Sequence, residues 1–128
     1  MALKDILKVM IVDDMSVSRG LMTQGLEEIG IKNIDFQKSG QDALNRLAVN
    51  PAHLVISDYN MPGMSGLDLL ENLRSNKQTQ QIGFILITGS PSQDLLERGV
   101  KLGLNNLIKK PFTTQSLKAS IEAVVGKI

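Results

Sequence analysis

Five short apolar runs rich in β-branched residues alternate with five longer amphipathic stretches along this chain. The runs cover residues 9–12, 34–36, 54–56, 84–87 and 107–108. The first, third and fourth runs are almost continuous in hydrophobicity, which is typical of strands that helices cover on both faces. We therefore predict five strands in one sheet, with helices packed against each face.

The amphipathic stretches have apolar residues at helical spacing, with start and stop signals at their ends. Ser39 and Ser65 are expected N-caps, and Gly30 is placed to end the first helix. The expected helices begin at or soon after Asp14, Ser39, Ser65, Pro91 and Pro111. Strand and helix alternating five times indicates an α/β fold with a parallel sheet and right-handed crossovers.

Composition limits the classes of function that remain open. The 128 residues are 42% hydrophobic, so we expect a single domain over residues 1–128. A net charge of +1 and 3% aromatic residues argue against nucleic-acid binding. Because the chain has neither a long apolar run nor a signal-peptide core, we expect no membrane insertion and a cytoplasmic location. With no cysteine and one histidine, His53, a bound metal would need oxygen ligands.

Polar residues that end the strands are the candidates for chemistry, because open parallel sheets bind ligands at the carboxyl ends of their strands. Strand 1 ends in Asp13 and Asp14, and strand 3 ends in Asp58. If these strands are neighbours, each like-charge pair at ~4 Å costs roughly 4 kcal/mol at an effective dielectric near 20. A divalent cation offsets this repulsion, and oxygen ligands alone favour Mg²⁺.

The same edge of the predicted sheet offers the parts of a phosphoryl-transfer site. An aspartate carboxylate can act as the nucleophile toward a phosphoryl group. Thr88 offers a hydroxyl, Gly89 leaves room above the acceptor, and Lys110 supplies a positive charge. Any one of these carboxylates could instead face water or cap a helix, but their combination on one edge favours phosphoryl chemistry.

Four segments carry a resemblance to a known family: residues 9–14, 55–62, 87–89 and 110–112. With these segments the chain resembles the receiver domains of two-component response regulators, and most of all the stand-alone chemotaxis regulators of the CheY type. The resemblance runs from about Lys8 to the end of the chain, which implies a receiver domain with no effector domain. It implies a three-layer, flavodoxin-like fold with five helices and a five-stranded parallel sheet in the order 2-1-3-4-5.

The resemblance also implies a role for each site residue. Asp58 would be the phosphoacceptor, and the donor would be a phosphohistidine on a partner histidine kinase. The Mg²⁺ ligands would be Asp14, Asp58, the backbone carbonyl of Asn60, and Asp13 through water. Lys110 would pair with the acceptor or phosphoryl group, Thr88 would bond a phosphoryl oxygen, and the Lys110–Pro111 peptide bond would be cis. The chain would not be an enzyme beyond its own aspartyl phosphorylation and dephosphorylation.

One position departs from the family pattern and leaves two roles open. The family usually has Tyr or Phe as a switch residue on strand 5, where this chain has Leu107. The chain could be a messenger whose phosphorylated form binds a protein such as the flagellar motor switch, with a phosphatase as a further possible partner. Alternatively, it could be a phosphate sink that drains the kinase without strong output.

Three other classes fit the sequence less well. A haloacid-dehalogenase-type phosphatase needs Asp-x-Asp after strand 1, but here Met15 follows two adjacent aspartates. A flavodoxin uses a hydroxyl-rich loop there, and a P-loop protein needs a glycine-rich Lys-Ser/Thr motif that this chain lacks. We expect Arg19, near the site, to be a solvated charge, and His53 and Lys109 to have no part in the chemistry.

Overall fold

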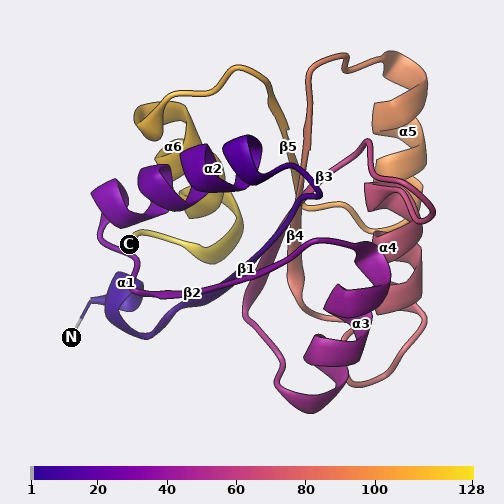
Figure 1. Ribbon diagram of the computed structural model, residues 1–128, viewed down its shortest axis with the longest axis horizontal. Coiled ribbons are helices and arrows are strands. Elements are labelled where there is room, and N and C mark those ends of the chain that lie inside the picture. Colours follow the sequence, from indigo (N-terminus) through magenta and orange to yellow (C-terminus); the bar gives the residue numbers. More distant parts are fainter. Residues whose placement is uncertain (1) are drawn as a thin grey trace.

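The computed structural model describes residues 2–128 and has five parallel strands in the order β2-β1-β3-β4-β5, as predicted (Figure 1). Strands and helices alternate along the chain. The elements are α1 (Leu3–Ile6), β1 (Lys8–Val12), α2 (Ser16–Ile29), β2 (Asn33–Gln37), α3 (Gly40–Val49), β3 (Leu54–Asp58), α4 (Gly66–Arg74), β4 (Gly83–Thr88), α5 (Gln93–Lys101), β5 (Asn106–Lys109) and α6 (Thr114–Val125).

The helix count differs from the prediction, because the described chain has six helices where five were expected. The additional helix, α1, is a single turn without a buried residue, so the sequence shows no amphipathic pattern there. The Asp5 carboxylate accepts a hydrogen bond from the Ala2 N–H at its start. Two predicted starts also move slightly, because the side chains of Ser92 and Thr113 cap α5 and α6.

The other local signals are confirmed. Ser39 and Ser65 are the N-caps of α3 and α4, and their hydroxyl oxygens accept hydrogen bonds from the N–H groups of Asp42 and Asp68. Gly30 ends α2 with φ of 102°, in the left-handed region that glycine adopts without a steric penalty. These ends are set by local hydrogen bonding and backbone freedom, which is why residue type alone located them.

Two apolar layers enclose the sheet, with α2 and α6 on one face and α3, α4 and α5 on the other (Figure 1). Alternate residues of a central strand enter opposite layers: Val55 packs toward α3 and α4, whereas Ile56 packs toward α2 and α6. Both faces of β3 are therefore buried, which explains its continuous hydrophobicity.

Strand register places the polar residues of the carboxyl edge together. Val12 of β1 pairs with Ser57 of β3, so the aspartates that follow each of them lie side by side. Thr88 of β4 pairs with Lys109 of β5 on the other side of β3.

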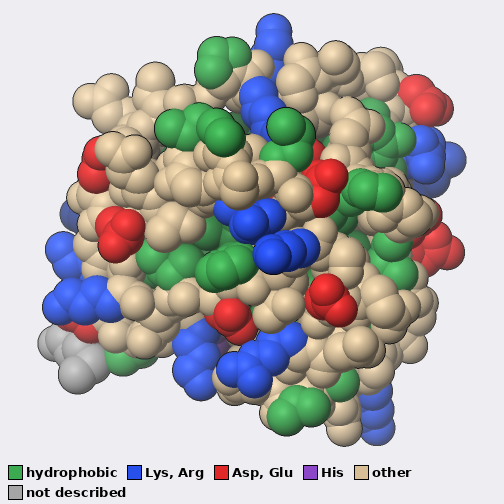
Figure 2. Space-filling model, viewed as in Figure 1, with side chains coloured by type: hydrophobic (Ala, Val, Ile, Leu, Met, Phe, Trp, Pro, Cys, Tyr) green, Lys and Arg blue, Asp and Glu red, His purple; other side chains and the backbone are tan. Residues whose placement is uncertain are grey.

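On the surface, acidic and basic side chains are interspersed over the face shown in Figure 2. No helix within residues 2–128 combines the length and apolar character needed to cross a bilayer.

Candidate functional site

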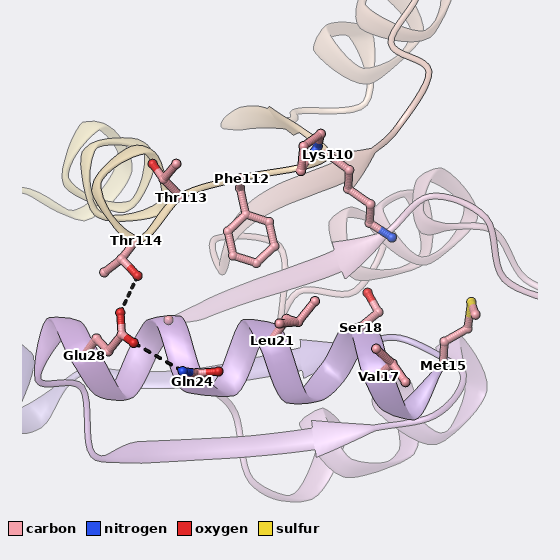
Figure 3. Close-up of a pocket in the computed structure, with 12 residues that line it drawn as sticks. Met15, Val17, Ser18, Leu21, Gln24, Glu28, Lys110, Phe112, Thr113 and Thr114 are labelled. Atoms are coloured by element: carbon pink, nitrogen blue, oxygen red, sulfur yellow. Dashed lines mark hydrogen bonds between the residues drawn. The ribbon is translucent and has the colours of Figure 1, made fainter.

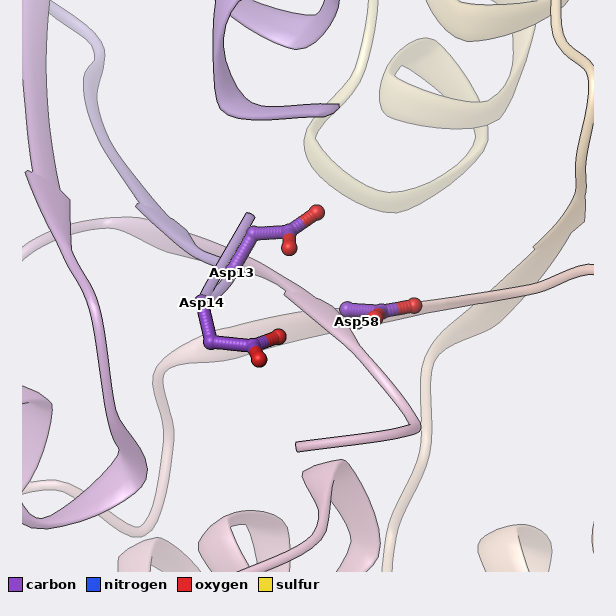
Figure 4. A group of neighbouring side chains, drawn as sticks. All are labelled: Asp13, Asp14 and Asp58. Carbon is purple, nitrogen blue, oxygen red and sulfur yellow. The ribbon is translucent and has the colours of Figure 1, made fainter. Parts of the chain in front are cut away.

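Three carboxylates meet at the carboxyl edge of β1 and β3. One oxygen from each of Asp13, Asp14 and Asp58 lies within 4.8 Å of the others, and the three groups point to the same side (Figure 4). Asp13 and Asp58 are buried, whereas Asp14 is exposed. The cluster expected from the ends of strands 1 and 3 is thus present, because these strands are neighbours in the sheet.

Asp13 is the least satisfied of the three. Its Oδ1 accepts a hydrogen bond of 3.0 Å from the Met15 N–H. Its Oδ2 is buried and accepts none from any residue between 2 and 128. A buried carboxylate oxygen without a donor is costly, and a hydrated cation beside it would remove that cost. The arrangement therefore fits a hard divalent ion such as Mg²⁺, which prefers carboxylate oxygen and retains several of its waters.

Asp58 is paired with the lysine predicted to lie beside it. Its Oδ1 is 3.0 Å from Lys110 Nζ. Burial raises the pKa of Asp58 above its ordinary value of 3.8, and the charge of Asp13 adds to this, although Lys110 opposes it. The Asp58 carboxylate is thus poorly solvated, and its contact with Lys110 offsets only part of the cost of burying its charge.

Thr88 and Lys110 are joined across the same edge. Thr88 is buried, its carbonyl accepts from the Lys110 N–H at 2.8 Å, and its Oγ1 accepts from the Ser90 N–H at 3.1 Å. The Thr88 hydroxyl proton therefore remains available to another acceptor. The space beside Gly89 is open, and the Lys110–Pro111 peptide bond is cis.

Two predicted positions lie beyond the cluster of acids. Asn60 is exposed in the loop between β3 and α4. Leu107 is half-buried on β5, opposite Leu86, and packs into the layer that contains α5.

The sequence did not predict the contacts that two residues beside the acidic cluster make. Gly66 opens α4, and a Cβ there would lie 2.5 Å from the Asp58 carbonyl oxygen, so only glycine lets the helix approach the acceptor strand. Arg19 is not a free solvated charge, since its Nη1 donates to the Asp13 carbonyl at 2.9 Å. A glycine directly after a serine N-cap was the one available signal for Gly66.

His53 makes a structural contact, and Lys109 is exposed. His53 Nδ1 accepts from the Lys8 N–H at 2.9 Å, at the opposite edge of the sheet from Asp58. Lys109 is exposed, as strand alternation predicted.

Fold and site together define a doubly wound α/β protein with an acidic, lysine-containing site at the carboxyl edge of its sheet. The sequence profile of the response regulator receiver domain matches residues 9–122, and the chain belongs to that family. Receiver domains are signalling modules and bind Mg²⁺ in an acidic pocket, which corresponds here to the cluster of Asp13, Asp14 and Asp58.

Individual relatives agree with the family. The chain is 40% identical over 128 residues to the "Probable chemotaxis protein CheY" of Rhizobium etli, covering 100% of this chain and 99% of the relative. It is 36% identical to "Chemotaxis protein CheY1" of Helicobacter pylori, covering 94% of this chain and 98% of the relative. The solved structure of chemotaxis protein CheY4 from Vibrio cholerae matches with a TM-score of 0.87 at 25% identity, covering 93% of this chain and 98% of that one.

Proposed function

We propose that this chain is a two-component response regulator that accepts a phosphoryl group from a histidine kinase on Asp58, in a reaction that requires Mg²⁺. The observation that carries the proposal is the unsatisfied, buried Oδ2 of Asp13 beside a buried Asp58 that contacts Lys110. A charge cluster of this kind costs stability unless ligands complete it. A cation and a phosphoryl group together would do so.

In this proposal, Asp14, Asp58 and the Asn60 backbone carbonyl hold the metal, and Asp13 holds one of its waters. When bound, Mg²⁺ supplies positive charge for the phosphoryl oxygens. A carboxylate oxygen of Asp58 attacks phosphorus in line with the donor imidazole, forming a P–O bond as the P–N bond breaks. The imidazole nitrogen keeps the electron pair. Lys110 Nζ moves from the carboxylate to the new phosphoryl group, and the free Thr88 hydroxyl proton bonds a phosphoryl oxygen.

The kinase is proposed to reach Asp58 across an apolar groove between α2 and the start of α6, with a volume of ≈ 750 Å³ (Figure 3). Met15, Val17 and Leu21 line one side and are 60%, 73% and 57% exposed. Phe112 faces them from the other side, and Lys110 extends toward the end where Met15 lies. Lys110 lines this groove and also contacts Asp58, so a kinase segment seated there could present its phosphohistidine to Asp58.

The decisive experiment is phosphorylation by a small donor such as acetyl phosphate, followed by intact-protein mass spectrometry. Wild-type protein with Mg²⁺ is expected to gain one phosphoryl group, whereas Asp58→Asn or removal of Mg²⁺ abolishes the gain. Asp94→Asn, which changes an exposed carboxylate in the first turn of α5, is the matched control and keeps full labelling. Normal labelling of Asp58→Asn would refute the proposed acceptor.

For output, we propose phosphorylation-dependent protein binding in chemotaxis, with the flagellar motor switch as target. The chemotaxis proteins among its relatives support the pathway. Leu107 favours a second candidate, a phosphate sink, because an aliphatic side chain cannot repeat the ring rotation of the family's usual aromatic. Pull-down with beryllofluoride-activated protein separates the two: a partner captured only on activation supports the messenger, and none leaves the sink.

A further inference from the structure

Arg19 links the acidic turn to α2, on which it lies, and to β2. Among residues 2–128 it forms no hydrogen bond to a carboxylate. From the first turn of α2, its Nη1 donates to the Asp13 carbonyl oxygen at 2.9 Å. Its backbone N–H donates to the Met15 carbonyl at 3.0 Å. The two contacts span the turn formed by residues 13–15, and Asp13 and Asp14 both project from that turn.

Phe36 braces the same guanidinium from the edge strand. The Arg19 guanidinium carbon lies 5.3 Å from the centroid of the Phe36 ring, within the range of a cation–π contact. Phe36 is 51% exposed, so its ring is not explained by core packing. β2 also holds the turn directly, since the Asp13 N–H donates to the Gln37 carbonyl at 3.1 Å. β2 and α2 thus hold the acidic turn from two sides.

We propose that Arg19, held against Phe36, is a positioning residue that fixes the Asp13–Asp14 turn and so sets the affinity of the acidic site for Mg²⁺. This inference rests on the proposed function, because it needs Mg²⁺ to bind there.

Charge and geometry make opposite predictions for Arg19. A cation near the site repels Mg²⁺, so if charge dominated, neutralising Arg19 would tighten binding. If positioning dominates, the loss of Arg19 frees the turn and weakens binding. Residues that orient metal ligands typically contribute 10–100-fold to affinity. The sign of the change therefore distinguishes the two effects.

The test is a titration of the full chain with MgCl₂, followed by ¹H–¹⁵N NMR shifts. Arg19→Met is expected to raise the Kd about tenfold. Phe36→Leu keeps the guanidinium but removes the ring, and should raise the Kd by a smaller factor. Arg46→Met is the matched control: it removes an arginine that also contacts β2, through Asp35, but at an exposed site, and should leave the Kd unchanged.

Amide hydrogen exchange in Mg²⁺-free protein gives a readout independent of the metal. The Met15 N–H, which donates to Asp13 Oδ1, should exchange severalfold faster in Arg19→Met than in wild type, and at the wild-type rate in Arg46→Met. Should Arg19→Met fold poorly, Arg19→Lys keeps the charge without the planar group, and is also expected to bind Mg²⁺ more weakly.

Each contrary result has a distinct meaning. Wild-type or tighter Mg²⁺ binding by Arg19→Met, or wild-type binding by Arg19→Lys, overturns the positioning role and leaves the proposed function intact. No Mg²⁺ binding by wild-type protein at millimolar concentration overturns the proposed function, and this inference with it.

Discussion

Charged groups lie at the carboxyl edge of the sheet, where the strands end, and at its amino edge, where they begin, but the surroundings of these groups differ. At the carboxyl edge, Asp13 and Asp58 are buried carboxylates, one of which has an oxygen without a donor among residues 2–128. At the amino edge, Arg74, the last residue of α4, donates five hydrogen bonds to neutral oxygens. These acceptors are the carbonyls of Gln80, Ile82 and Gly103, and Oδ1 of Asn105.

Arg74 joins the segments that precede β4 and β5. Asn105 Oδ1 accepts from both Arg74 and the Phe84 N–H, so the arginine is connected to the start of β4. Burial lowers the pKa of Arg74 from its ordinary value, but a guanidinium remains charged in proteins. Its donors are matched by neutral oxygens: the hydrogen bond to the Ile82 carbonyl is part-buried, and the other four lie at exposed positions.

The difference separates structural from functional charge. The Arg74 cluster is complete without any ligand, so it should stabilise the fold and leave ligand binding unaffected. The cluster of aspartates is incomplete on its own, so it should reduce stability until a cation binds. Substitutions at the two edges should therefore change stability in opposite directions.

The largest effect is expected at Arg74. Arg74→Met removes five hydrogen bonds, among them the part-buried one to the Ile82 carbonyl, and should lower the free energy of unfolding by about 2–3 kcal/mol, measured by urea denaturation. Arg98→Met, at an exposed position of α5, is the control and should change stability little. Mg²⁺ affinity should remain at the wild-type value in both variants. A stability loss at Arg74 no greater than at Arg98 would contradict the structural role.

Adding Mg²⁺ should give the next largest effect. At a concentration ten times its Kd, a ligand that binds only the native state raises the free energy of unfolding by about 1.4 kcal/mol. Wild-type protein should show this increase in urea denaturation. Asp14→Asn, which removes an exposed carboxylate of the cluster, should lose most of it. An equal increase in both proteins would place the cation elsewhere.

Asp58→Asn should give the smallest effect, and with the opposite sign to Arg74→Met. Because the pKa of Asp58 is raised in the native state, its stabilising contribution is present below pH 3.8 and is lost as the pH rises through the raised value. Without metal, Asp58→Asn should therefore be more stable than wild type at pH 7, on the order of 1 kcal/mol. The difference should disappear on acidification. A less stable variant at pH 7 would mean that the Lys110 contact outweighs desolvation.

Local patterns predicted the features that depend on neighbours in sequence. Hydrophobic runs located the five strands, and Ser39 and Ser65 located two helix starts through hydrogen bonds three residues away. The acids at the ends of strands 1 and 3 were predictable. Alternation of strands and helices makes the strands parallel and places their carboxyl ends at the same edge of the sheet. The turn α1 was missed because it buries nothing that a pattern could show.

The order of hydrophobic and polar residues thus determined the fold class and the acidic edge of this protein by itself. Only the tertiary structure decided that Arg19 holds the Asp13 carbonyl, that Gly66 lets α4 approach Asp58, and that Arg74 joins two loops. Periodicity and capping act over a few residues of chain, whereas these contacts depend on distances between elements that packing alone sets.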